Sequence, residues 1–209
     1  MRATVMCVTT LIFCMAAFGC GGPPGAQPGV EVVKENVPEL PAIQGPPDVA
    51  LRRAALEGQM PIVQSALAKG ADVNASNADG VTALMLAGAK GYRDLVDMLL
   101  SKGARADAAT KEDKVTALMM AANWGHTPVV DLLLDKGANL STEDGGKRTV
   151  LDWAGMDESV KPEDSKALQR HLKEKGAKES KQQGALGLFL SVGSMPKLGA
   201  LLERAALEK

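Results

Sequence analysis

The chain has 209 residues, a formal net charge of −1, 45% hydrophobic residues and only 3% aromatic residues. A charge so close to zero leaves no basic footprint for binding nucleic acid. With so few aromatic residues, a core must be built from Leu, Val, Ala and Met, which suits close packing between small-residue helices.

The first 20 residues have the layout of a secretory signal. Arg2 precedes an apolar stretch over residues 5–18 that is too short, and too interrupted by threonine, to span a membrane by itself. The stretch runs into Ala-Phe-Gly-Cys at residues 17–20, a junction that resembles the lipobox of bacterial lipoproteins. The resemblance implies a signal peptide over residues 1–19 and a lipid on Cys20, which would anchor the protein in the bacterial cell envelope, at the outer membrane or the periplasmic face of a membrane. A plain secretory signal and an uncleaved anchor are the alternatives.

Residues 20–47 would carry the lipidated cysteine and then a linker. Residues 21–47 hold seven prolines and five glycines and show no helical period. This composition is typical of a flexible or polyproline-like tether, which we expect to hold the following domain away from the bilayer. Cys7 and Cys14 would leave with the signal, so we expect neither a disulfide nor a metal set in the mature domain.

From residue 48 onward the chain repeats with a period of about 33 residues. The word Lys-Gly-Ala stands at residues 69–71, 102–104, 136–138 and 175–177, each time after a run of apolar residues. A second glycine column, formed by Gly58, Gly91 and Gly125, precedes the first three copies by 12 residues. A period of this length is typical of a solenoid, in which each unit buries its apolar face against its neighbours.

The openings of the second and third units carry a resemblance to a known family. Val-Thr-Ala-Leu-Met stands at residues 81–85 and again at 115–119, and these words resemble the ankyrin repeat, which usually opens with Thr-Pro-Leu-His. The resemblance covers residues 48 to about 178 and implies an all-α solenoid of four to five helix-turn-helix units with hairpin-like finger loops. We expect a repeat domain over residues 48–209, with repeats at about 48–79, 80–113, 114–147 and 148–180 and a degenerate C-terminal cap at 181–209.

The sequence offers little catalytic chemistry. Its two histidines, His126 and His171, lie in different repeats and neither has a Cys, Asp or Glu at metal-ligand spacing. Carboxylates on the expected second helices have lysines nearby, which is typical of a solvated face. We therefore expect no enzyme, no cofactor and no bound metal.

A surface for binding remains. In ankyrin-like proteins, partners are held by the loop tips and by the exposed end of the first helix of each unit. The resemblance implies five contact residues in these columns: Val81, Lys90, Trp124, Arg148 and Met156. We expect Trp153 to pack in the core, whereas Trp124 either contacts the partner or folds over the adjacent helix pair.

These features predict a monomeric, membrane-tethered ankyrin-repeat module that binds another protein in the bacterial cell envelope. The alternative is an inhibitor or immunity protein that protects against a toxin or an envelope enzyme. An envelope hydrolase would need a second domain that this length does not provide.

Overall fold

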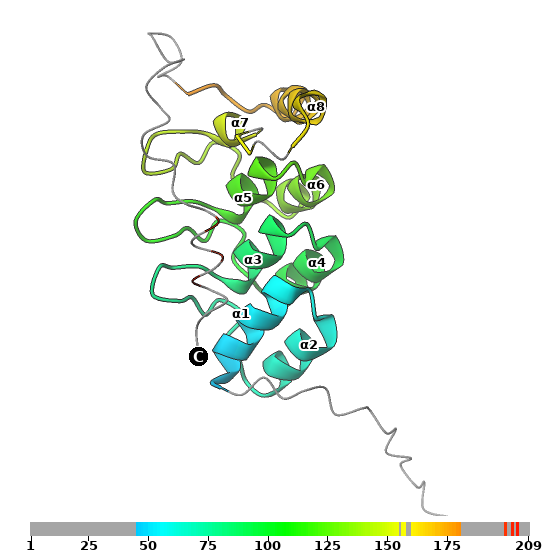
Figure 1. Cartoon of the computed structure of the whole chain (residues 1–209), viewed down its shortest axis with the longest axis vertical. Helices are drawn as coiled ribbons and strands as arrows, with labels where there is room; N and C mark the ends of the chain where they lie inside the picture. The colour runs from blue at the N-terminus through cyan, green and yellow to red at the C-terminus, as the bar shows by residue number, and fades with distance from the viewer. Residues whose placement is uncertain are drawn as a thin grey trace, which may run out of the picture. The chain divides into compact units, whose positions relative to one another are not determined.

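The computed structural model describes residues 45–154, 156, 157, 160–180, 199, 202 and 204. The predicted signal peptide, Cys20 and nearly all of the predicted linker lie outside these residues, as does most of the predicted cap. Over the described residues the chain forms eight α-helices and no named strand (Figure 1): α1 (Pro47–Glu57), α2 (Met60–Ala68), α3 (Ala83–Ala89), α4 (Arg93–Ser101), α5 (Ala117–Asn123), α6 (Thr127–Asp135), α7 (Val150–Trp153) and α8 (Pro162–Glu174).

The helices form pairs that stack in chain order, as the period predicts. The inner helices α1, α3, α5 and α7 lie in one row and the outer helices α2, α4, α6 and α8 in a second row (Figure 1). Helix α3 packs against α1, α4 and α5, and α5 packs against α3, α6 and α7. The predicted all-α repeat solenoid is therefore confirmed.

The inner helices begin at a threonine for a local reason. The side-chain oxygens of Thr82 and Thr116 accept hydrogen bonds from the backbone N–H groups of Met85 and Met119, each at 3.4 Å. Each bond satisfies one of the N–H groups that the first turn of a helix leaves unpaired. The repeated Thr-Ala-Leu-Met words therefore mark two helix starts.

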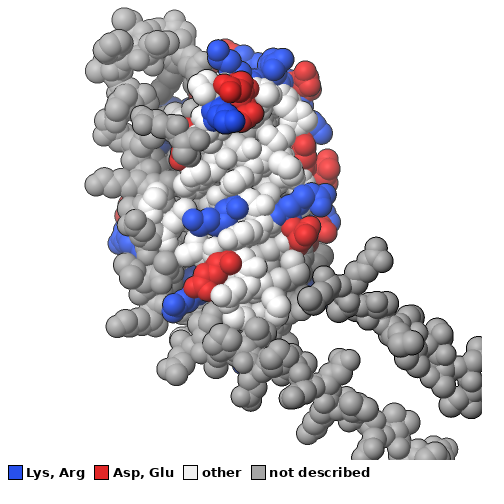
Figure 2. Space-filling model, turned by 45° about the vertical axis from the view of Figure 1, so that its right-hand side comes forward, with Lys and Arg blue, Asp and Glu red and all other residues white. Residues whose placement is uncertain are grey.

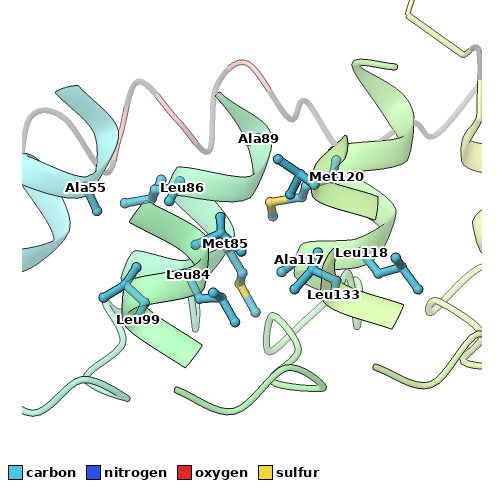
Figure 3. Close-up of a cluster of buried hydrophobic side chains, with 14 of the residues drawn as sticks. Ala55, Leu84, Met85, Leu86, Ala89, Leu99, Ala117, Leu118, Met120 and Leu133 are labelled. Carbon is cyan, nitrogen blue, oxygen red and sulfur yellow. The ribbon is translucent and has the colours of Figure 1, made fainter. Parts of the chain in front are cut away.

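The core lies between the rows of helices. Every residue of α3 and of α5 is buried, and Figure 3 shows their Leu, Met and Ala side chains filling the space around the two helices. From the outer row, Leu99 of α4 and Leu133 of α6 are fully buried in the same cluster. None of the helices in the described part of the chain is both long and apolar enough to cross a bilayer.

The finger loops are closed by one polar side chain each. The Oδ1 atom of Asn77 accepts the N–H groups of Asp79 and Val81, at 3.0 and 2.8 Å. In the next loop Thr110 Oγ1 accepts the N–H of Val115 at 2.9 Å. These side chains hold the hairpins in shape, because they pair backbone donors that the turns leave free.

Neighbouring loops are also joined through their backbones. The N–H of Lys111 donates to the carbonyl of Asp79 at 2.9 Å, and the N–H of Gly145 donates to the carbonyl of Asp113 at 2.7 Å. Asp79 and Asp113 occupy the same place in successive repeats. The loops therefore stack in the same register as the helices.

Candidate functional site

The structure corrects one predicted contact residue, Val81, at once. Its side chain is fully buried and belongs to the core. Both backbone groups of Val81 bond to Asn77, since its N–H donates to the side chain and its carbonyl accepts the N–H of Asn77 at 3.0 Å. This closure of the hairpin leaves the Val81 side chain among the core residues, where it cannot reach a partner.

Arg148 is also engaged inside the protein, which corrects a second predicted contact. Its side chain is only 13% exposed, and its Nε atom lies 2.7 Å from Oδ2 of Asp144, whose side chain is 0% exposed. The guanidinium carbon lies 4.8 Å from the centroid of the Trp153 ring, and the indole Nε1–H donates to Asp144 Oδ2 at 3.1 Å.

This arrangement is a closed structural cluster. A buried carboxylate is costly unless it is paired and hydrogen-bonded, and here the N–H groups of Gly146 and Arg148 also donate to Asp144 Oδ1, at 2.9 and 2.8 Å. Trp153 is buried, as the sequence predicts. The cluster therefore ties Asp144, Arg148 and Trp153 of the fourth unit together, and the Asp144 carboxylate and the Arg148 Nε atom are engaged within the protein.

The other three predicted contact residues lie at or just after the C-terminal ends of inner helices. Lys90 is the C-cap of α3 and Trp124 is the C-cap of α5, while Met156 follows the short helix α7 and donates its N–H to the carbonyl of Trp153 at 3.2 Å. We call Lys90, Trp124 and Met156 the helix-end column.

Exposure differs along the helix-end column. Lys90 is exposed, whereas Trp124 and Met156 are each partly buried. Trp124 packs against the hydrophobic core with part of its side chain, which agrees with the packing alternative, while its contact with a partner stays a prediction. An aromatic side chain that packs against the core on one side is already held in place. It can therefore bury apolar surface of a partner with its open side and lose little side-chain entropy on binding.

Sequence reasoning missed Tyr92, which follows Lys90 of this column by two residues. Its side chain is 37% exposed, and among the described residues it is the large hydrophobic residue that lies at the surface. Its ring lies over Gly58 of the preceding unit, where an added Cβ would come within 2.7 Å of the ring. The signal was in the sequence: Tyr92 directly follows a repeat glycine, in the same place as His126.

His126 performs the same stacking one unit later. Its ring lies over Gly91, where a Cβ would come within 2.7 Å of Nδ1, and its Nε2–H donates to the carbonyl of Ala89 at 3.1 Å. Burial lowers the pKa of His126, and the hydrogen bond to Ala89 opposes that shift. His126 is therefore a link between two repeats, and its environment favours the neutral ring.

The remaining polar features are structural or solvated. His171 Nε2 and Asp131 Oδ1 lie 2.5 Å apart and join α8 to α6, and the described residues contain no group of three or more His, Cys, Asp and Glu side chains that could hold a metal ion. Lys and Arg intermingle with Asp and Glu on the face shown in Figure 2. A shallow depression on α8 is lined by Lys166, Gln169, Arg170 and Lys173.

Comparison with known proteins agrees with this geometry. Residues 51–144 match the family model for ankyrin repeats, described as three copies. The search of curated proteins returns no match to the chain. The matched region runs from within α1 to the loop before α7, so the part of the chain that resembles ankyrin repeats covers the first three helix pairs.

Proposed function

We propose that this protein is a non-catalytic module that binds another protein through the helix-end column and Tyr92, while a lipid on Cys20 tethers it to the bacterial cell envelope. The observation that carries the binding surface is Trp124, a partly exposed indole at the end of a helix that is otherwise buried. Trp and Tyr are residue types that often dominate binding energy.

The chemistry of this surface indicates the kind of partner. Lys90 supplies a mobile positive charge in the column, and Tyr92 and Trp124 supply apolar area with a polar atom at the edge. A partner that fits would present an apolar patch bordered by a carboxylate. Such a surface is typical of a folded protein and does not suit nucleic acid, for which a basic stripe would be needed.

The test is a capture experiment with the purified repeat protein as bait, followed by affinity measurement with the captured partner. Trp124→Ala should weaken binding by about 2 kcal/mol or more, roughly 30-fold, the usual threshold for a hot spot. Its melting temperature should change little, because the indole is supported from one side only.

Lys166→Ala is the matched control, since Lys166 is exposed on the outer helix α8 and does not belong to the helix-end column. Equal loss of affinity in both variants, or unfolding by Trp124→Ala with unchanged affinity of the folded fraction, would remove the column from the proposal. In that case the loop tips near Asn77 and Glu112 are the next surface to test.

The lipid anchor is tested separately. Mass spectrometry of the mature N-terminus should find an acylated Cys20 as the first residue, and Cys20→Ser should release the protein from the membrane fraction. A mature protein that begins at another residue and is recovered without lipid would overturn the anchor while leaving the binding surface intact.

A further inference from the structure

Every residue of the inner helices α3 and α5 is buried, so each side of both helices is covered. Helix α3 is contacted by α1, α4 and α5, and its buried residues include Leu86 and Ala89. Helix α5 has the same character, with Met120 fully buried. A helix that is apolar all round is stable in water only where every side is covered.

Part of the chain near the C-terminus packs against these helices. Gly199, Leu202 and Arg204 are helical, and the red segments near the C-terminus run beside α3 in Figure 1. Leu202 is only 8% exposed and belongs to the same buried apolar cluster as the inner helices.

An ion pair joins Arg204 to the loop before α3. Arg204 Nη1 is 3.5 Å from Oδ1 of Asp79, which stands in the loop just before α3. Asp79 belongs to the early part of the array, two helix pairs before α8. The contact places Arg204 against the first repeats, whereas a cap stacked after α8 would lie at the opposite end of the array.

The sequence around Leu202 suits a helix in a groove. Leu198, Leu201, Leu202 and Ala205 follow the spacing of a single helical stripe. An amphipathic segment of this kind typically docks with its apolar stripe in a hydrophobic groove and its charges toward solvent. Arg204 fits this pattern, because its side chain remains 68% exposed while it pairs with Asp79.

We propose that the inner face of α1, α3 and α5 is a docking groove and that its occupant is the C-terminal segment of this same chain, held by Leu202 and by the Arg204–Asp79 pair. The segment keeps the apolar face covered until a protein partner displaces it. The docking of the segment is inferred from the contacts described above. Its displacement by a partner rests on the proposed binding function.

Site-directed cross-linking tests the docking without any partner. In the full chain, with Cys7, Cys14 and Cys20 replaced by serine, the pair Ala78→Cys and Ala205→Cys leaves Asp79 and Arg204 in place, and it should join rapidly through a short bismaleimide and remain a monomer. The matched control keeps Ala205→Cys and pairs it with Lys173→Cys on α8, where the yield should be at least about tenfold lower.

Two results would overturn the docking. A higher yield for the Lys173→Cys pair would show that the segment caps α8, and a cross-linked dimer would show that the groove takes a second copy of the chain. Because this assay needs no partner, it can succeed where capture of a partner fails, and the two proposals can be judged apart.

A second measurement tests whether the segment covers an apolar face. Leu202→Asp should raise the fluorescence of the apolar dye ANS several-fold, with far-UV circular dichroism unchanged, while Leu202→Met should leave the dye signal as it is. If the partner competes with the segment, Leu202→Asp should also tighten partner binding, by about tenfold. Unchanged dye binding would overturn the docking, and unchanged partner affinity would overturn the displacement.

Discussion

At the scale of single residues, the stack is joined by side chains that reach back over a glycine. Gly58, Gly91 and Gly125 have positive φ angles of 72, 75 and 70°, and Tyr92, His126 and Val160 of the following units occupy the space where a Cβ would stand. These glycines therefore have two roles. They allow the left-handed backbone turn, and they leave space for the side chain of the next unit.

The burial of His126 predicts a pH dependence of stability. The unfolded chain takes up a proton as the pH falls through the ordinary histidine value of about 6.5, whereas the folded protein resists it because its pKa is lowered. Stability that is fully present above pH 6.5 should thus be lost as the pH falls toward the folded-state pKa. His126→Gln keeps a donor for Ala89 but does not titrate, so its melting temperature should fall less between pH 7.5 and 5.5. Parallel melting curves for the two proteins would contradict this role.

Lys147 offers a second test at a single position. It has a φ of +60°, a left-handed conformation that costs an L-residue about 1–2 kcal/mol, and glycine stands at the equivalent place in the first loop, at Gly80. Glycine adopts this conformation without strain, and its larger loss of backbone entropy on folding offsets only part of that gain, so Lys147→Gly should raise the free energy of unfolding by about 0.5–1 kcal/mol in urea titrations. Lys136→Gly is the control: its φ is −88°, so it should not stabilise. A loss of stability in Lys147→Gly would show that the turn is not strained.

At the scale of the helix pair, stability comes from a few fully buried side chains. Leu99 of α4 is fully buried, while its neighbour Leu100 is only partly buried and packs at the edge of the core. The two leucines are identical in chemistry and adjacent in sequence, so a comparison isolates burial.

Leu99→Ala should lower the free energy of unfolding by about 2–5 kcal/mol, since it removes transfer energy and leaves a cavity in the core. Leu100→Ala should cost less than half as much, because its site is open to water on one side. Chemical denaturation of both variants gives the comparison directly. Equal effects would mean that the orientation of α4 differs from that described.

The sequence predicted the helix pairs but misassigned two contact residues, for one physical reason. Val81, Val115 and Arg148 share a column, and so do the loop-closing residues Asn77, Thr110 and Asp144. The period alone does not say which way a column points, and the structure shows that this one points inward. In the fourth unit Arg148 occupies the place that valine has in the second and third units. The carboxylate of Asp144 pairs with Arg148 and so offsets the cost of burying its charge. The spacing of four residues between Asp144 and Arg148 was the available signal.

At the scale of the whole array, no unit has a core of its own. Helices α3 and α5 pack on one another and on the helices to either side, and their loops are joined by backbone hydrogen bonds such as that between Lys111 and Asp79. In a solenoid of this kind stability is a sum of unit terms and interface terms, and short arrays unfold as one body when the interface terms dominate.

A substitution in one unit should therefore weaken its neighbours. Leu133 of α6 is fully buried, and Leu133→Ala should cost about 2–5 kcal/mol through its own cavity. If the interfaces couple the units, native-state hydrogen exchange should show reduced protection in α3 as well as in α5 and α6, because the slowest amides exchange through opening of the whole array. A loss of protection confined to residues 114–147 would instead show that the units unfold independently and that the interfaces between them couple them only weakly.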